Sequence, residues 1–289
     1  MTVRALDHLA PAAAEASSGF LTAADGTRLF HRQWHPPGPI HAAIAVVHGH
    51  GEHGGRYGNL VDHLVPRGYV VWAADLRGNG RSDGPRGHLT GWSEYRDDLR
   101  LVLGAMRSAH LGVPLFAWGH SLGALVVLEA VLRAPLGLTG AVASAPPLVP
   151  TVTGRWLPAL ARLVSPLWPG WSVRLGLDAA GLSREPGVVE ANRADPLNHR
   201  RISARLGTEA RTAIRWTMNN ADMLRTPLLI VHGGADRLSS PAGSRAFMTR
   251  ATFPDRQLLE YEGGYHELHN DTIRNTVLGD VERWLRRHV

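Results

Sequence analysis

The sequence contains no cysteine among its 289 residues. This absence excludes disulfide bonds, thiolate metal sites and a cysteine nucleophile. Lysine is absent too, so arginine supplies all of the strongly basic side chains, and the formal net charge is +6. The arginines are scattered, and the only adjacent pairs lie at residues 200–201 and 286–287. Because no basic stripe could follow a phosphate backbone, we expect no nucleic-acid partner, although a mild attraction to anionic membrane surfaces stays open.

Long apolar runs are also lacking, and no stretch approaches the length that spans a bilayer. Asp7 and Glu15 interrupt the N-terminal region, where a secretory signal needs a continuous apolar segment. We therefore expect a cytoplasmic protein, with peripheral contact at a membrane surface as an extension. With 44% hydrophobic residues, a chain of this length can bury a large core, which predicts one domain with an insertion.

Short apolar runs alternate with segments of helical periodicity along most of the chain. A hairpin is predicted where residues 20–22 and 27–34 flank an Asp-Gly turn. Six further apolar runs predict buried strands, at residues 44–47, 69–73, 115–118, 141–143, 228–231 and 257–261. Helices are predicted at residues 57–65, 92–109, after residue 121, at 241–251 and at 273–285. This order predicts an α/β fold, with a mostly parallel central sheet and helices on both faces.

The alternation stops between residues 146 and 207. This stretch is rich in proline and tryptophan, and it contains no convincing strand. We interpret it as a helical cap inserted over the carboxyl edge of the sheet. The alternative is an ordinary helical layer whose tryptophans belong to the core. The predicted organisation is a core of residues 1–147, a cap of residues 148–207 and a second core segment of residues 208–289.

The sequence GHSLG at residues 119–123 matches the pattern G-x-S-x-G. An apolar run precedes it and a long apolar helical segment follows, which is the strand–turn–helix context of a nucleophile elbow. On such a turn the serine Oγ is exposed at the carboxyl edge of the sheet, in a strained backbone conformation. Glycine suits positions 119 and 123, because a Cβ would collide where strand and helix approach. The pattern therefore predicts Ser121 as a nucleophile.

An acid and then a histidine are expected to follow the serine in chain order, each on a loop after a strand. Asp236 follows the apolar run 228–231, and His266 follows the run 257–261. His266 is predicted to take the proton from the serine Oγ, while Asp236 orients the imidazole. His269 is the competing base and Glu262 the competing acid. An aspartate beside a Gly-Gly turn is also a common turn former.

An acyl-transfer site needs backbone N–H groups that receive the tetrahedral oxyanion. Leu122, at the start of the helix after the serine, is predicted to supply one of them. The loop HGHGEH at residues 48–53 is predicted to supply the second from His50, because its glycines let the loop fold tightly towards the serine.

The same loop carries a competing hypothesis. His48, His50, Glu52 and His53 have nearly the spacing of an H-x-H-x-D-H zinc motif, which would make the protein a metallohydrolase. Glutamate replaces the usual aspartate, and the glycines suit an oxyanion loop equally well. A metal site would also leave a complete serine triad without purpose. We therefore expect no metal and no cofactor.

Six motifs spread over nearly the whole chain form one combination: HGHGEH (48–53), DLRGNGRS (75–82), GHSLG (119–123), SAPP (144–147), GAD (234–236) and YHELH (265–269). This combination resembles the monoacylglycerol lipase and lysophospholipase branch of the α/β-hydrolases. The resemblance implies a triad of Ser121, Asp236 and His266, an oxyanion hole from His50 and Leu122, and a cap that carries an acyl-chain pocket. Segment 75–82 is interpreted as a structural loop held by an Asp–Arg pair.

The sequence thus predicts a serine esterase that cleaves single-chain lipid esters, with monoacylglycerol as the preferred substrate. Lysophospholipids and small aryl esters are alternative substrates of the same triad. A zinc metallohydrolase and a non-catalytic hydrolase-like binding protein are the alternatives from other classes. Apolar cap residues are hypothesised to line an acyl tunnel and partly to face a membrane: Trp156, Leu160, Leu163, Leu167, Trp168 and Trp171. The oligomeric state is left open.

Overall fold

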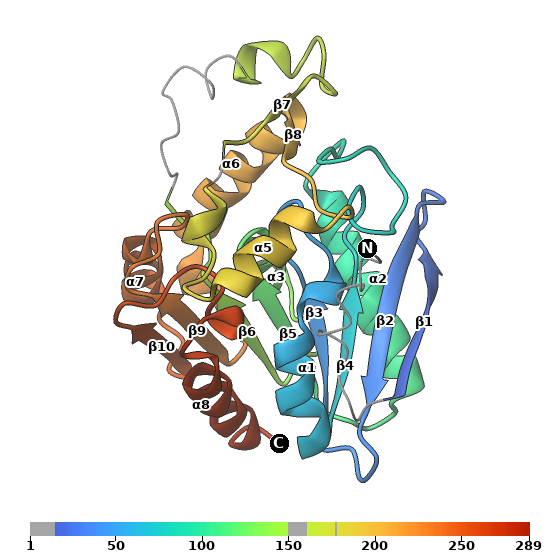
Figure 1. The fold of residues 1–289 in the computed structure, drawn as a ribbon, viewed down its shortest axis with the longest axis vertical. Helices are drawn as coiled ribbons and strands as arrows, with labels where there is room; N and C mark the ends of the chain where they lie inside the picture. The colour runs from blue at the N-terminus through green and yellow to red at the C-terminus, as the bar shows by residue number, and fades with distance from the viewer. Residues whose placement is uncertain (1–14, 150–160, 177) are drawn as a thin grey trace, which may run out of the picture.

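A computed structural model describes residues 15–149, 161–176 and 178–289. Eight strands form one sheet in the order β1-β2-β4-β3-β5-β6-β9-β10 (Figure 1). The hairpin of β1 (Glu15–Thr22) and β2 (Arg28–His35) joins the rest of the sheet antiparallel, through β2 and β4. The other strands are mutually parallel: β4 (Tyr69–Ala74), β3 (Ala42–Val47), β5 (Leu115–His120), β6 (Gly140–Ser144), β9 (Leu228–Gly233) and β10 (Arg256–Tyr261). The predicted mostly parallel sheet is confirmed.

Helices cover both faces of this sheet and create two apolar cores. On one face lie α2 (Ser93–Ala109), α3 (Leu122–Arg133) and α7 (Pro241–Arg250), and on the other lie α1 (Gly58–Leu64) and α8 (Arg274–Arg286). Along β3, Ala45 packs into the first core and its neighbour Ile44 into the second. Because both faces are covered, all six residues of β3 are buried and apolar, which explains why its sequence shows no alternation.

Described residues between β6 and β9 form a cap over the carboxyl edge of the parallel strands (Figure 1). Its described elements include β7 (Ser172–Arg174), α5 (Pro186–Ala194), β8 (Arg201–Ser203) and the start of α6 (Ala204–Asn219). The expectation that this stretch contains no strand is wrong, because β7 and β8 pair antiparallel. Each has only three residues, too few to show a two-residue period in the sequence. The predicted boundary at residue 207 falls inside α6, and the domain limits stay a prediction.

Two contacts anchor the cap on the loop that follows β3. The His199 N–H donates to Gly51 O at 2.8 Å, and His53 Nε2 lies 2.7 Å from Asp195 Oδ2. The cap is therefore held next to the loop predicted to supply the oxyanion hole. In the three described ranges, no helix is long and apolar enough to cross a membrane.

The segment 75–82 has the structural role expected of it. Arg77 makes a two-pronged ion pair with Asp98 on α2, with N···O distances of 2.7 and 2.6 Å. Asp75 accepts the backbone N–H groups of Gly54 and Arg81, each at 2.8 Å. These bonds fix the loop after β4 to its neighbours, and none of these side chains lines the cavity described below.

Candidate active site

Ser121 lies on the turn between β5 and α3, with φ 50° and ψ −117°. This left-handed region costs a residue with a side chain about 1–3 kcal/mol, and such strain is concentrated at functional sites. The Ser121 N–H donates to Ser144 O at the end of β6, at 2.9 Å, which holds the turn against the neighbouring strand. The backbone geometry predicted for this turn is present.

Glycines flank the serine where β5 and α3 approach most closely. A Cβ at position 119 would overlap the Gly123 carbonyl, and a Cβ at position 123 would overlap the carbonyl of Val47 on β3. Close packing leaves no room for either atom without backbone movement. Glycine is therefore required at both positions for the turn to sit against the sheet.

His266 and Asp236 lie on the loops after β10 and β9, and the structure brings them together. His266 Nδ1 is 2.7 Å from Asp236 Oδ2, while the other oxygen of Asp236 accepts the N–H groups of Leu238 and Ser239 at 2.8 and 2.9 Å. Burial lowers the pKa of His266, but the Asp236 carboxylate outweighs it and the net pKa is raised. Burial raises the pKa of Asp236, and the His266 charge and hydrogen bonds reverse this and lower it. The pair is arranged to hold a proton on Nδ1.

The competing acid and base are placed elsewhere. His269 is fully buried and stacks on Tyr57 with ring centroids 4.8 Å apart, and burial lowers its pKa to about 4. Glu262 is exposed and makes no hydrogen bond or ion pair with His266 in the part of the chain that the structure describes. His120 is buried beneath the turn, and its ring centroid is 4.8 Å from that of His266. The geometry favours His266 and Asp236 over both competitors.

The two residues predicted to bind the oxyanion lie beside the serine. Leu122 is the first residue of α3, where backbone N–H groups have no acceptor within the helix. His50 follows β3 and lines the same cavity as Ser121. Glu52 Oε1 accepts the Gly49 N–H at 2.6 Å and so fixes the loop immediately before His50. The positions suit an oxyanion hole, and that assignment remains a proposal.

Three of the four side chains of the zinc hypothesis have separate partners. His48 Nε2 accepts the Leu76 N–H at 2.8 Å, His53 pairs with Asp195 at 2.7 Å, and Glu52 is held by a buried arginine. Within the described ranges, no group of three or more His, Cys, Asp or Glu side chains is arranged to hold a metal ion. This geometry gives the zinc hypothesis no support.

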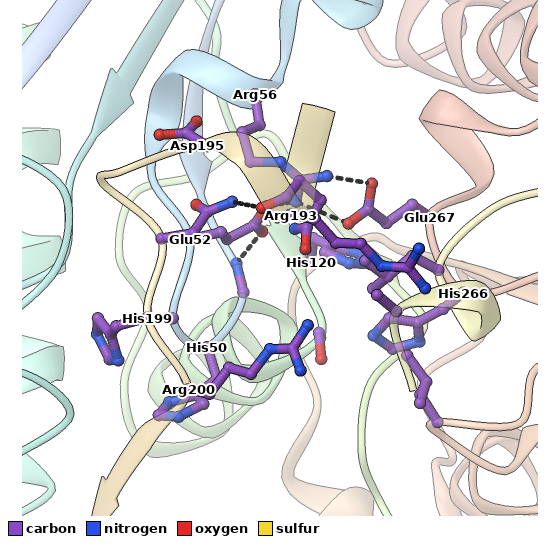
Figure 2. Close-up of a pocket in the computed structure, with 18 of the residues that line it drawn as sticks. His50, Glu52, Arg56, His120, Arg193, Asp195, His199, Arg200, His266 and Glu267 are labelled. Carbon is purple, nitrogen blue, oxygen red and sulfur yellow. Dashed lines mark hydrogen bonds and ion pairs between the residues drawn. The ribbon is translucent and has the colours of Figure 1, made fainter. Parts of the chain in front are cut away.

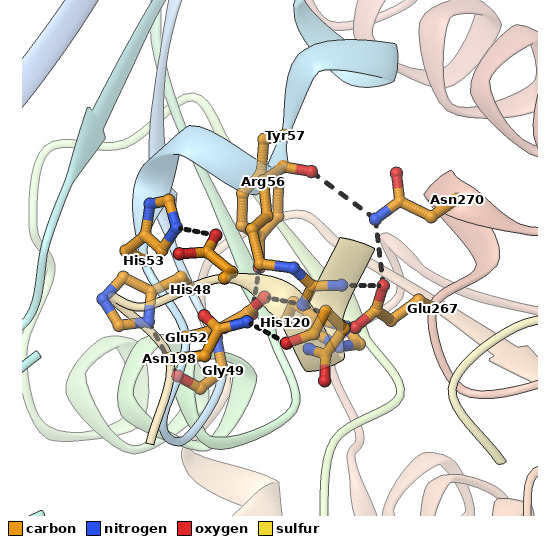
Figure 3. A network of polar contacts seen from close by, with 12 residues as sticks. His48, Gly49, Glu52, His53, Arg56, Tyr57, His120, Asn198, Glu267 and Asn270 are labelled. Atoms are coloured by element: carbon orange, nitrogen blue, oxygen red, sulfur yellow. Dashed lines mark hydrogen bonds and ion pairs between the residues drawn. The ribbon is translucent and has the colours of Figure 1, made fainter. Parts of the chain in front are cut away.

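A buried polar network joins the loop after β3 to the loop after β10 (Figure 3). Arg56 Nη1 is 2.5 Å from Glu52 Oε2, and both terminal nitrogens of Arg56 bind Glu267 at 2.7 and 2.8 Å. The Tyr57 hydroxyl donates to Glu52 at 2.9 Å, and Asn270 Nδ2 donates to Glu267 at 3.0 Å. Burial raises the pKa of Glu267, but Arg56 outweighs it and lowers the value to about 2. The network fixes the loop of His50 relative to the loop of His266.

A cavity of about 230 Å³ lies between the sheet edge and the cap (Figure 2). Ser121, His120, His266 and the loop after β3 form its core side. Its cap side is mainly polar and includes Asp178, Asn192, Arg193, Asp195, Asn198, His199 and Arg200. Sequence analysis missed this cap side. The only signal was the density of polar residues at 192–200, and nothing in it indicated which side of the cap faces the serine.

The apolar cap residues predicted to line an acyl tunnel are absent from the lining of this cavity where they are described. Leu163, Leu167 and Trp168 are 72%, 73% and 68% exposed, and none of them lines the cavity. These side chains are exposed on the cap, and their role in an acyl tunnel stays a prediction. Trp156 and Leu160 lie outside the described residues. Surface exposure is compatible with the second half of the hypothesis, contact with a membrane.

Comparison with known proteins matches residues 38–273 to the family described as Hydrolase_4: Serine aminopeptidase, S33. The chain belongs to this family of α/β-hydrolases. It is 35% identical to the monoacylglycerol lipase of Mycolicibacterium smegmatis over 266 residues, which cover 91% of this chain and 95% of that protein. It is 31% identical to phospholipase YtpA of Bacillus subtilis, over 84% of this chain and 94% of that protein.

Among solved structures, the monoacylglycerol lipase of Paleococcus ferrophilus matches with a TM-score of 0.84 and 33% identity, over 90% of this chain and 99% of that chain. The sheet, the cap and the family match together confirm the predicted α/β-hydrolase fold and the predicted branch of the superfamily. This α/β-hydrolase is a serine ester hydrolase.

Proposed function

We propose that this enzyme hydrolyses carboxylic esters of single-chain lipids, and that it converts monoacylglycerol to glycerol and a fatty acid. The observation that carries the proposal is the arrangement of Ser121 and His266 on one cavity, with His266 Nδ1 2.7 Å from Asp236. The similarity to monoacylglycerol lipases over more than nine tenths of the chain supports the substrate class.

In the proposed mechanism, His266 Nε2 accepts the Ser121 proton as Oγ attacks the ester carbonyl carbon. Asp236 accepts the hydrogen bond from Nδ1–H and stabilises the imidazolium that forms. The N–H groups of His50 and Leu122 donate to the oxyanion. The protonated His266 then gives its proton to the departing alcohol oxygen, which leaves an acyl-enzyme. Water attacks the acyl group in a second, equivalent round, releases the fatty acid and restores the serine.

The size and polarity of the cavity favour a small polar alcohol group. At about 230 Å³, it lies below the 300–1,000 Å³ typical of pockets that enclose a drug-sized ligand. A glycerol unit and the reacting ester suit this space, whereas a long acyl chain must extend beyond it. A second acyl chain on the glycerol has no counterpart in the cavity, so triacylglycerol should be a poor substrate.

We also propose that the enzyme works in the cytoplasm at a membrane surface, with the cap outermost. The exposed apolar side chains of Leu163, Leu167 and Trp168 support this orientation. They would contact the lipid layer from which a single-chain ester is extracted, while the polar side of the cap faces the serine.

Hydrolysis rates on a matched set of esters test the proposal. The set contains a monoacylglycerol, a lysophospholipid, a 4-nitrophenyl ester and a triacylglycerol, all with the same acyl chain. We expect kcat/KM for the monoacylglycerol to exceed that for the triacylglycerol by at least about tenfold, because the cavity that receives the glycerol side of the ester has no room for further acyl chains. Equal rates on the two glycerides would contradict the single-chain assignment, and cleavage of the nitrophenyl ester alone would indicate a general carboxylesterase.

A further inference from the structure

The cap contributes two arginines to the cavity. Arg193 lies in the last turn of α5, and Arg200 directly precedes β8. Both line the cavity that contains Ser121 and His266, and Figure 2 shows both side chains extending into it. Neither guanidinium has a hydrogen-bond or ion-pair partner among the described residues. By contrast, Arg56, the third arginine of the cavity, forms ion pairs with Glu52 and Glu267.

Two cap anchors fix the positions of these arginines next to the reacting serine. Arg193 lies two residues before Asp195, which binds His53 at 2.7 Å. Arg200 directly follows His199, whose N–H donates to Gly51 O at 2.8 Å. Gly51 and His53 belong to the loop that carries the proposed oxyanion donor. The backbone of each arginine is therefore held close to the place where an ester carbonyl would bind.

In the described structure, none of the four carboxylates that line the cavity makes an ion pair with Arg193 or Arg200. Glu52 and Glu267 are bound by Arg56, and Asp195 is bound by His53. Asp178 also lines the cavity, but one of its oxygens accepts the Ala180 N–H at 3.0 Å as a cap of the following helical turn. The position of Arg193 near a helix C-terminus explains a favourable charge there, but it does not explain why the side chain lines the cavity.

We propose that Arg193 and Arg200 form a subsite for the phosphate of an anionic single-chain glycerolipid, with the phosphate on the alcohol side of the scissile ester. The inference rests on the proposed function and names a further substrate class for the same serine. Planar guanidinium groups suit phosphate oxygens, because each can donate two parallel hydrogen bonds. An acylglycerol phosphate places its charge within a few bonds of the ester, where both arginines lie.

Paired substrates test the subsite. Octanoylglycerol and octanoylglycerol 3-phosphate, both used as monomers in solution, are compared for the wild type and for Arg193→Ala/Arg200→Ala. We expect the ratio of kcat/KM, phosphate ester over neutral ester, to fall by at least about tenfold in the double variant, because charge-assisted hydrogen bonds to the phosphate are lost. Arg211→Ala is the control, since Arg211 is exposed on α6 and does not line the cavity.

Two further experiments, inhibition by small phosphates and binding to vesicles, identify which phosphate-containing molecule the arginines bind. Glycerol 3-phosphate should inhibit octanoylglycerol hydrolysis by the wild type more strongly than inorganic phosphate, and the double variant should lose this inhibition. Equal inhibition by inorganic phosphate, with no cleavage of the phosphate ester, would instead assign the arginines to free phosphate and overturn the substrate class. Binding to phosphatidylglycerol vesicles should be the same in both proteins. Weaker vesicle binding by the double variant, with an unchanged ratio, would assign the arginines to the membrane surface and overturn the subsite.

Failure of the subsite and failure of the proposed function give different results. If the wild type cleaves octanoylglycerol and the ratio is unchanged in the double variant, only the subsite is wrong. If the wild type cleaves neither ester, both proposals are wrong.

Discussion

His266 experiences two opposing influences on its pKa. Burial lowers this pKa, but the Asp236 carboxylate, 2.7 Å from Nδ1, raises it by a larger amount. The net pKa therefore lies above the ordinary 6.5. The proposed base must be neutral to accept a proton. Activity should therefore be present at pH values above this pKa and should be lost as pH falls through it.

The first prediction concerns this pH profile. We expect the acidic limb of kcat/KM to have its midpoint above 6.5 in the wild type. Asp236→Asn removes the largest influence that raises the pKa of His266, so the limb should move to lower pH, and the plateau should fall by at least about 10²-fold because the imidazole loses its orienting charge. The matched control is a folded His269→Ala variant, which should keep the wild-type midpoint. If the acidic limb moved in His269→Ala and not in Asp236→Asn, the assignment of His266 as the base would be wrong.

At the scale of secondary structure, the junction of β5 and α3 depends on Gly123. A Cβ there would overlap the carbonyl of Val47 on β3, so helix and sheet would have to separate. Gly104, in the middle of α2, has nothing within 4 Å of its hypothetical Cβ. The two glycines are thus a matched pair, one required by packing and one not.

The second prediction follows from this pair. Gly123→Ala should lower the free energy of unfolding by about 1–3 kcal/mol through overpacking, and it should also reduce activity by moving the serine. Gly104→Ala should raise the free energy of unfolding by about 0.5–1 kcal/mol, since alanine favours an unobstructed helix. Urea unfolding of both variants measures the difference. Equal effects would show that the junction is looser than the structure indicates.

Most elements of the core could be predicted from the sequence, because strands buried on both faces are short apolar runs and each is followed by a segment of helical period. Ser121, Asp236 and His266 could be proposed as a triad because each lies just after such a run. The pair β7–β8 could not be found, since three-residue strands held by a distant partner carry no pattern. Arg193 and Arg200 were missed for a related reason: their placement depends on how the cap docks, and local sequence does not encode docking.

At the scale of the whole molecule, the two sides of the cap differ in character. The cap residues that line the cavity are mainly polar, whereas Leu163, Leu167 and Trp168 are exposed and do not line it. Isolated exposed apolar residues are common, but several gathered on one segment favour contact with a partner or a lipid layer. The sequence indicated the apolar character of the cap, but not which of its residues line the cavity.

The third prediction tests the outer surface. Replacing Leu163, Leu167 and Trp168 together by serine should weaken binding to lipid vesicles by at least about tenfold, because buried apolar area drives interfacial binding. Hydrolysis of a water-soluble ester should change little. Leu111→Ser is the control, since Leu111 is 83% exposed on the loop between α2 and β5, away from the cap. Unchanged vesicle binding, or an altered acyl-length preference on dissolved esters, would argue against a purely external role.

Covalent labelling of Ser121 tests the central claim most directly. The wild type is treated with a fluorophosphonate and the labelled peptide is identified by mass spectrometry, alongside a Ser121→Ala variant whose fold is checked by circular dichroism. We predict that the label is found on Ser121 alone, and that the folded variant is unlabelled, with kcat lower by on the order of 10³-fold or more. A folded Ser121→Ala variant that keeps its activity, or a label on another residue of the wild type, would contradict the assignment of Ser121 as the nucleophile.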